Sequence, residues 1–259
     1  MQVIAYGQQK KVSVTGAIAS INTKDLLKSP SGSAGSALAG AVTGISSVQI
    51  SGQPGAEDPD IYVRGTGSLS NEASKPLILV DGVERSFFQM DSHEIESVTV
   101  LKDASSTAVF GVRGANGVIL VTTRRGTKGK PQISWNSTFG LTQSLRHLTG
   151  VDSYTYATLY SEAQRSDNPG IKDDQLTFSP FVTEMFRTKA DPIMFPDVDW
   201  SKYIFKNVAW QTQHNATLSG GGDSMRYFVS LGYLDQDGMM KRFDESYDPN
   251  YNYQRFNYR

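Results

Sequence analysis

Residues 95–123, IESVTVLKDASSTAVFGVRGANGVILVTT, decide the fold of the first part of the chain. The run 97–101 alternates apolar and polar side chains, a pattern that predicts a strand. Asp103 stands where an N-cap residue is expected for a helix over 104–110. An Asn-Gly turn then leads into the apolar run 118–122, which predicts a second strand.

The residues before this stretch extend the same small domain. The Ala-rich segment 33–45 carries apolar residues at helical spacing and predicts a short helix. The β-rich runs 61–63 and 77–80 each end in a turn that contains glycine, so each predicts a short strand. Short apolar strands between short helices indicate an α+β domain built on a small mixed sheet.

The chain changes character near Gly126. The first 126 residues hold two of the 12 Tyr, three of the 12 Phe and none of the three Trp, so most aromatic residues follow that point. The segment 124–131 (RRGTKGKP) reads as a basic, solvated linker punctuated by Gly and Pro. We therefore predict two domains, over residues 1–126 and 127–259.

The second domain is predicted to be built from antiparallel strands. Residues 133–141 and 225–233 alternate apolar with polar or small side chains, apart from Phe228. Residues 213–219 form a weaker strand joined to the next one by a Gly-rich turn, and a further alternation starts at Tyr251. Strands of this length with one apolar, aromatic face fit either a transmembrane β-barrel or a soluble sandwich.

The connections favour the barrel. One connection, about 142–212, is long and includes a predicted helix over 152–164, whereas the next connection is a tight turn. Long loops at one end and tight turns at the other are typical of outer-membrane barrels.

Composition removes several classes of function. The chain has no Cys and only three scattered His, so we expect no thiolate chemistry, no metal site and no cofactor. The formal net charge of −1 gives no sign of nucleic-acid binding. No triad or phosphate-loop motif is present, and we expect no enzyme activity. The N-terminus shows no signal peptide, and no apolar run approaches the roughly 20 residues of a membrane helix.

Ordered motifs along the chain resemble SusC/RagA-type TonB-dependent outer-membrane transporters. In the plug region they are residues 3–11 (VIAYGQQKK), 36–45 (SALAGAVTGI), 51–56 (SGQPGA), 61–68 (IYVRGTGS), 76–83 (PLILVDGV) and 95–123. In the strand region they are Asp199-Trp200, 214–221 (HNATLSGG) and 227–238 (YFVSLGYLDQDG). Ala5 stands where the family often has Gly.

The resemblance implies an N-terminal fragment of such a transporter: an α+β plug domain, followed by the first antiparallel strands of a barrel of about 22 strands. The plug, residues 1–126 with its preceding TonB-contact segment, is expected inside the lumen facing the periplasm. Residues 127–259 are expected to start the barrel, with one long extracellular loop.

The implied function is TonB-dependent import of oligosaccharides, or of peptides, across the bacterial outer membrane. The implied partners are a SusD-like surface lipoprotein, TonB with ExbB and ExbD behind it, outer-membrane lipid and the substrate. Two other hypotheses remain open: a receptor that mainly signals the presence of substrate, and a soluble β-rich carbohydrate-binding module.

Two groups of candidate site residues follow from the resemblance. The segment that TonB contacts by strand addition is expected at Gln2, Val3, Ile4, Ala5 and Tyr6; the alternative is an ordinary terminal strand or a frayed end. The plug motifs supply candidates for gating or for contact between plug and barrel: Arg64, Gly65, Asp81, Gly82, Lys102, Asp103, Arg113 and Gly114. The charged members either hold the plug against the wall or stabilise the plug itself.

Overall fold

The computed structural model describes residues 2–4, 7–9, 18–29, 31–67, 74–145, 150–243, 246 and 248–259. The chain splits into two compact units. Unit 1 comprises residues 1–142, 209–238 and 251–259, and unit 2 comprises residues 143–208 and 239–250. The plug and the strands that follow it therefore share a compact unit, and the predicted domain boundary at Gly126 falls inside that unit.

The plug contains the predicted mixed sheet. Its five strands are β3 (Ile18–Asn22), β6 (Leu77–Val80), β7 (Val83–Glu84), β8 (Ile95–Leu101) and β9 (Val118–Thr123). They lie in the order β3-β8-β9-β6-β7. The pair β6 and β9 is parallel and the other three pairs are antiparallel. The strands predicted from the deciding stretch, β8 and β9, are thus neighbours at the centre.

Apolar side chains from the sheet and two short helices form the plug core. The helices are α1 (Thr23–Leu26) and α2 (Ala34–Leu38). The fully buried side chains of this core include Leu26, Leu38, Phe87, Ile95, Val98, Val100 and Ile119. Each side chain of this size contributes about 1.5–3 kcal/mol by leaving water.

The predicted helix over 33–45 is wrong in its second half. Helix α2 ends at Leu38, and Ile45 begins strand β4 (Ile45–Val48), which pairs with β5 (Asp60–Val63). Gly40 and Gly44 have φ angles of 74° and 77°, which an α-helix does not contain. The backbone already leaves the helix at Ala39, whose ψ angle is 126°, and apolar spacing alone does not reveal this.

The helix predicted over 104–110 is divided. It consists of α3 (Ala104–Thr107) followed by the 3-10 segment η4 (Ala108–Gly114). Asp103 occupies the N-cap position as predicted, but its side chain makes no capping hydrogen bond. Its carboxylate pairs with Arg64 instead.

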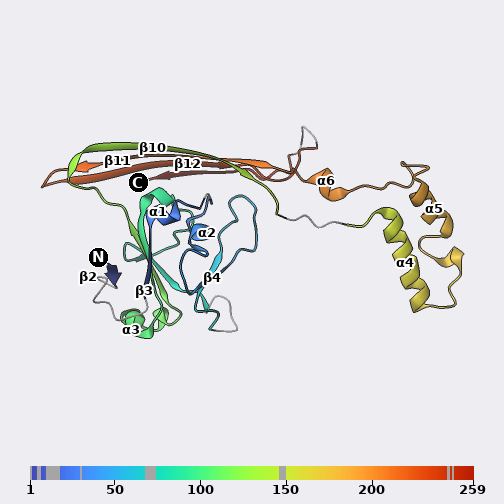
Figure 1. Cartoon of the computed structure of the whole chain (residues 1–259), viewed down its shortest axis with the longest axis horizontal. Helices are drawn as coiled ribbons and strands as arrows, with labels where there is room; N and C mark the ends of the chain where they lie inside the picture. The colour runs from blue at the N-terminus through green and yellow to red at the C-terminus, as the bar shows by residue number, and fades with distance from the viewer. Residues whose placement is uncertain are drawn as a thin grey trace. The chain divides into compact units, whose positions relative to one another are not determined.

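A four-stranded antiparallel sheet follows the plug. Its strands are β10 (Gly129–Thr142), β11 (Ala209–Gly221), β12 (Arg226–Gln236) and β13 (Tyr253–Tyr258), in chain order. A tight turn, in which Gly222 N donates to Met225 O at 2.8 Å, joins β11 to β12. We call the end of the sheet that carries this turn the turn end. We call the opposite end, where the strands lead into unit 2, the loop end. Figure 1 shows the plug beside one broad face of this sheet.

The two faces of the sheet differ in chemistry, as the period-two pattern predicted. The row of register partners on the plug side is Asn136, Asn215, Gly232 and Asn257. The neighbouring row on the other side is Trp135, Ala216, Leu231 and Tyr258. Trp135 is 67% exposed and Tyr258 is 85% exposed. The outer face is thus mainly apolar and aromatic, whereas the inner face is mainly polar, with Phe228 and Leu234 as exceptions.

Unit 2 is a small helical insertion. It contains α4 (Ser153–Asp167), the 3-10 turn η5 (Asp173–Gln175), α5 (Pro180–Thr188) and α6 (Trp200–Ile204). Helix α4 confirms the helix predicted over 152–164, and Asp152 caps it by accepting a hydrogen bond from Thr155 N at 2.9 Å. Phe178 packs edge-on against the rings of Tyr156 and Tyr160. In the described part of the chain, none of the helices combines the length and the apolar character needed to cross a membrane.

Candidate functional site

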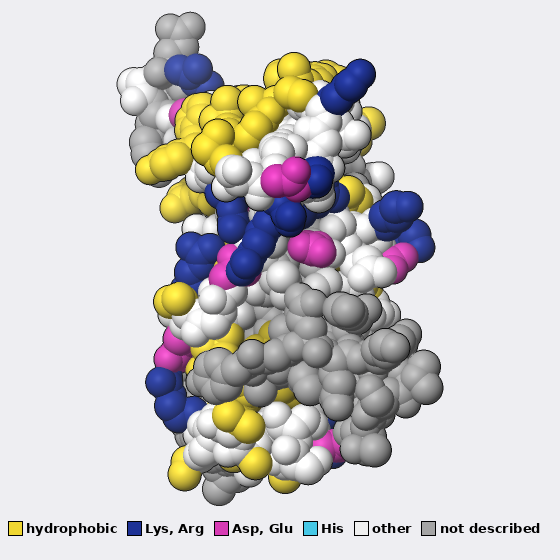
Figure 2. Space-filling view, turned by 90° about the vertical axis from the view of Figure 1, so that its left-hand side faces the viewer, with side chains coloured by type: hydrophobic (Ala, Val, Ile, Leu, Met, Phe, Trp, Pro, Cys, Tyr) yellow, Lys and Arg dark blue, Asp and Glu magenta, His cyan; other side chains and the backbone are white. Residues whose placement is uncertain are grey.

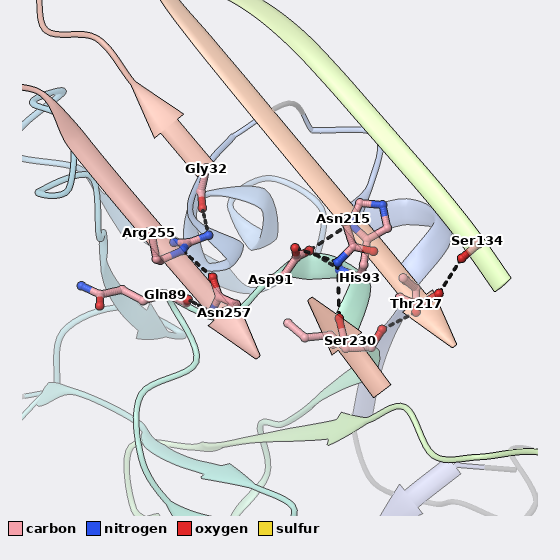
Figure 3. A network of polar contacts seen from close by, with 12 residues as sticks. Gly32, Gln89, Asp91, His93, Ser134, Asn215, Thr217, Ser230, Arg255 and Asn257 are labelled. Atoms are coloured by element: carbon pink, nitrogen blue, oxygen red, sulfur yellow. Dashed lines mark hydrogen bonds and ion pairs between the residues drawn. The ribbon is translucent and has the colours of Figure 1, made fainter. Parts of the chain in front are cut away.

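The plug meets the inner face of the four-stranded sheet through polar groups, and we call this contact the seam. On the plug side the seam consists of Gly32, Glu57, Asp81, Gln89, Asp91 and Glu94. On the sheet side it consists of Asn215, Ser230, Gln236, Arg255, Asn257 and Arg259. Figure 3 shows the central part of the seam, where Asp91 points toward Asn215 of β11, and Arg255 and Asn257 of β13 point toward the plug.

Asp91 is the centre of the seam and is only 2% exposed. One oxygen accepts hydrogen bonds from His93 N at 2.8 Å and His93 Nδ1 at 2.9 Å, and the other accepts from Asn215 Nδ2 at 3.0 Å. Burial alone acts to raise the pKa of Asp91, but the hydrogen bonds from His93 and Asn215 outweigh it and lower the pKa below 3.8. Asp91 is therefore a buried carboxylate held in its charged form.

Gly232 has no side chain, and the carboxylate of Asp91 fills the space that a side chain would need. A Cβ atom at position 232 would lie 2.6 Å from Asp91 Oδ2 and 3.5 Å from Asp91 Cγ. The carboxylate thus sits directly over the backbone of β12. Only glycine permits this approach without a shift of the plug turn.

Glu94 lies three residues after Asp91 and is 5% exposed. Burial raises the pKa of Glu94 above 4.5, and the nearby charge of Asp91 raises it further. Arg259, Arg85 and a hydrogen bond with Ser230 act in the opposite direction but do not cancel this effect. Glu94 Oε1 has no hydrogen-bond partner among the described residues. The two neighbouring carboxyl groups therefore have pKa values displaced in opposite directions.

This difference predicts a specific pH dependence for Glu94. A carboxyl group with a raised folded-state pKa favours the folded state below its unfolded pKa, and this contribution is lost as the pH rises through the folded pKa. We expect Glu94→Gln to raise the melting temperature of the plug at pH 7.5, with a difference from wild type that shrinks as the pH falls to 4.5. Differential scanning calorimetry of the full-length receptor measures this.

The matched control is Glu96→Gln, which makes the same charge change two residues away on an exposed side chain. It should leave the melting temperature of the plug unchanged. Equal shifts for both variants, or a lower melting temperature for Glu94→Gln at pH 7.5, would contradict the assignment.

A second group of contacts lies toward the loop end of the seam. Gln236 Nε2 donates to Glu57 Oε1 at 3.0 Å, and Arg255 Nη2 donates to Gly32 O at 2.9 Å. Burial raises the pKa of Glu57, and the hydrogen bond from Gln236 offsets this only in part. Asn257 Nδ2 donates to Gln89 O at 3.0 Å, between this group and Asp91. The seam therefore continues along β12 and β13.

Most of the charged plug-motif residues contact other plug residues. Arg64 pairs with Asp103 at 2.5 Å, Lys102 donates to Thr43 O, and Arg113 pairs with Glu84. These contacts agree with the alternative in which the charged residues stabilise the plug. The three motif glycines have structural reasons to be glycine. Gly65 and Gly82 have φ angles of 92° and 88°, and a Cβ at Gly114 would lie 2.8 Å from Thr107 O.

Asp81 is a plug-motif residue that reaches the four-stranded sheet. Arg259 Nη2 donates to Asp81 Oδ2 at 3.4 Å, and Thr123 donates to the same carboxylate from its backbone N and its hydroxyl. Burial acts to raise the pKa of Asp81, but the hydrogen bonds from Thr123 and the Arg259 guanidinium outweigh it and lower the pKa. Asp81 thus links the end of β6 to β9 and to the end of β13.

The predicted TonB-contact segment is described in part. Gln2, Val3 and Ile4 form β1 (Gln2–Ile4), which pairs antiparallel with β2 (Gly7–Gln9). Ala5 and Tyr6 lie outside the described residues. The role of the segment stays a prediction.

The sequence did not single out the principal seam residues, Asp91, Glu94, Asn215 and Gly232. A signal was present for the two sheet residues, because both fall on the non-apolar side of the strand alternation. A polar row on a strand predicts either solvent or a polar partner, and it does not say which plug turn will meet it.

Comparison with known proteins identifies the family. Residues 10–118 match the TonB-dependent Receptor Plug Domain family. The chain is 32% identical over 250 residues to the TonB-dependent receptor SusC of Bacteroides thetaiotaomicron. The aligned region covers 92% of this chain and 22% of that protein. It is 35% identical over 240 residues to the TonB-dependent receptor P3 of Formosa agariphila, covering 92% of this chain and 21% of that protein.

Solved structures agree with these matches. The RagAB peptide importer in its open-open state superposes with a TM-score of 0.71 at 26% identity, covering 99% of this chain and 30% of that chain. A structure of the RagAB peptide transporter gives 0.70 at 28% identity, covering 94% and 28%. The chain spans about a fifth of the length of the curated relatives it matches. The fold is thus that of the plug domain and the following antiparallel strands of a TonB-dependent receptor. Within that class, the chain belongs to the SusC-like receptors.

Proposed function

We propose that the chain supplies the plug and the first wall strands of an importer in the bacterial outer membrane that moves oligosaccharides or peptides inward. The seam is the observation that carries this proposal. The plug core is apolar, whereas the seam consists mainly of hydrogen bonds and charged groups, with Leu234 and Tyr253 as apolar contacts among them. Hydrogen bonds contribute only about 0.5–1.5 kcal/mol each, because water replaces the lost partner. A plug held in this way separates from the wall at a lower cost than its own core unfolds.

The two faces of the sheet support the same assignment. The exposed aromatic and aliphatic side chains of the outer face suit contact with lipid. A soluble carbohydrate-binding module would cover such a face with protein instead. By the usual arrangement of outer-membrane barrels, the tight turn between β11 and β12 faces the periplasm and unit 2 faces the outside.

The partners follow from the family. TonB, energised through ExbB and ExbD, would pair with Gln2–Tyr6 by strand addition, and a SusD-like lipoprotein would cover the external opening. The RagAB importers are named for peptides, so peptides and oligosaccharides are the two candidate substrate classes for this chain.

Uptake by intact cells tests this function. We expect cells that carry the full-length receptor to accumulate at least one of three labelled probes: maltoheptaose, an oligogalacturonate or a mixed peptide pool. Accumulation should stop when a protonophore removes the proton gradient. Accumulation that ignores the protonophore, or that does not need the receptor, would overturn the proposal.

A variant pair tests the TonB-contact segment within the same assay. Val3→Pro removes a backbone N–H from β1 and should abolish both uptake and capture of the receptor by the TonB C-terminal domain. Val3→Thr keeps the N–H and the β-branched shape and should retain both activities. Equal behaviour of the two variants would place TonB contact elsewhere.

A further inference from the structure

A groove lies where the chain leaves the plug and enters the wall. It has a volume of about 600 Å³ and is bounded by the segment after β9 and by the inner face of β10 and β11 near the turn end. The lining includes Arg124, Arg125, Thr127, Ser134, Thr217 and Phe228. The hydrogen bond from Arg124 N to Glu94 O, at 2.8 Å, fixes one side of the groove to the seam.

The two arginines of the groove form no ion pair with any described residue. Among the residues that the structure describes, no carboxylate lies within ion-pair distance of Arg124 or Arg125, whereas Arg64, Arg113 and Arg259 each pair with one. Glu96 is the one acidic residue of the described lining, and it forms no ion pair with either arginine. Figure 2 shows Lys and Arg side chains gathered on this side of unit 1, between the apolar sheet residues and the plug.

The rest of the lining is made of neutral hydrogen-bonding groups and one aromatic ring. Ser134 and Thr217 face each other across β10 and β11, with their hydroxyl oxygens 2.5 Å apart, and Ser219 extends this hydroxyl row. Phe228 supplies an aromatic ring at the edge of the row. Hydroxyl groups match the hydroxyls of a sugar, and an aromatic ring packs against the apolar face of a pyranose.

We propose that this groove binds the carboxylate of an acidic oligosaccharide through Arg124 and Arg125 during its passage toward the periplasm. A guanidinium group presents paired N–H donors whose spacing matches the two oxygens of a carboxylate. Arginines already paired with protein carboxylates lack this capacity, so the free pair marks the binding position. The proposal rests on the proposed import function and names the substrate class.

Binding to the purified full-length receptor in detergent tests the groove. Three probes of equal length are titrated by calorimetry: trigalacturonate, neutral maltotriose and triglutamate. We expect trigalacturonate to bind most tightly, and its affinity to fall as salt rises. Arg124→Gln combined with Arg125→Gln should weaken its binding by about tenfold or more, as expected for the loss of charge-assisted hydrogen bonds.

The matched control is Lys128→Gln combined with Lys130→Gln, which removes the same charge from the same connecting segment. Lys128 pairs with Asp223, and neither lysine lines the groove, so binding should change by less than about twofold. Equal weakening by both double variants, or no binding of trigalacturonate, would overturn the proposal. Tighter binding of triglutamate than of trigalacturonate would overturn its assignment to a saccharide.

The outcome is separate from that of the uptake assay. If the receptor imports neutral probes in a way that needs the proton gradient but binds no acidic probe, the proposed import function stands and the proposed role of the groove is wrong. Binding of trigalacturonate by the wild type, lost in the arginine variant, supports the groove even if no probe accumulates in cells.

Discussion

Import is expected to stop when the plug is tied to the wall by a disulfide between positions 91 and 232. A Cβ at position 232 would lie 3.5 Å from Asp91 Cγ, which is the position that a sulfur would occupy in Asp91→Cys. This spacing lies within reach of a disulfide. The chain has no Cys of its own, so no other thiol of these 259 residues competes. In the oxidised double variant we expect uptake to fall to background, and reduction should restore it.

Three controls isolate the tether. Each single variant shows the effect of disturbing the seam without a covalent link. The pair Ser137→Cys and His214→Cys joins β10 to β11 on the outer face, where the two side chains are hydrogen-bonded at 2.9 Å, and should leave uptake unchanged after oxidation. Unchanged uptake by a fully oxidised 91–232 pair would show that substrate passes without separation of the seam at Asp91.

Gly232→Ala is expected to weaken the seam by about 2 kcal/mol, because overpacking a filled site typically costs about 1–3 kcal/mol. The added methyl group would lie 2.6 Å from Asp91 Oδ2, and Asp91 cannot move away without losing hydrogen bonds from His93 or Asn215. Hydrogen exchange of the backbone amides of residues 91–95 in the full-length receptor should accelerate by about 30-fold, the factor that corresponds to this free energy.

Gly140→Ala is the matched control for this variant. Gly140 also lies on the inner face of the sheet, but a Cβ there would meet its nearest neighbour at 3.8 Å, which is an ordinary contact. We expect no change of exchange at residues 91–95. Equal exchange rates in both variants would mean that the plug turn adapts freely and that Asp91 does not hold the seam.

Most of the fold could be predicted because the local signals agree with the final structure. The alternation in residues 133–141 survives as the exposed outer face of β10, and the apolar runs around the Asn-Gly turn become β8 and β9. The helix over 33–45 failed for a local reason. Its apolar spacing is helical, but the backbone turns extended at Ala39, and the positive φ angles of Gly40 and Gly44 keep the helix from resuming.

The seam could not be predicted, since it joins residues that are remote in sequence. Asn215 and Asp91 are separated by 124 residues, and Gln236 and Glu57 by 179. In the sequence, nothing distinguishes Asp91 or Glu57 from the exposed acidic residues near them. Arg64, Lys102 and Arg113 were predicted as candidates because they are charged and belong to family motifs. Each of them contacts another residue of the plug.

The strand order of the plug also constrains when this domain can assemble. The central strand β9 is the last plug strand to be synthesised, and both of its neighbours, β8 and β6, precede it in the chain. The sheet is therefore incomplete until residue 123 is available, and β3 pairs with a strand more than 70 residues downstream. Pairings of such long sequence separation close slowly. During synthesis the nascent plug thus remains an open chain at least until residue 123 is available.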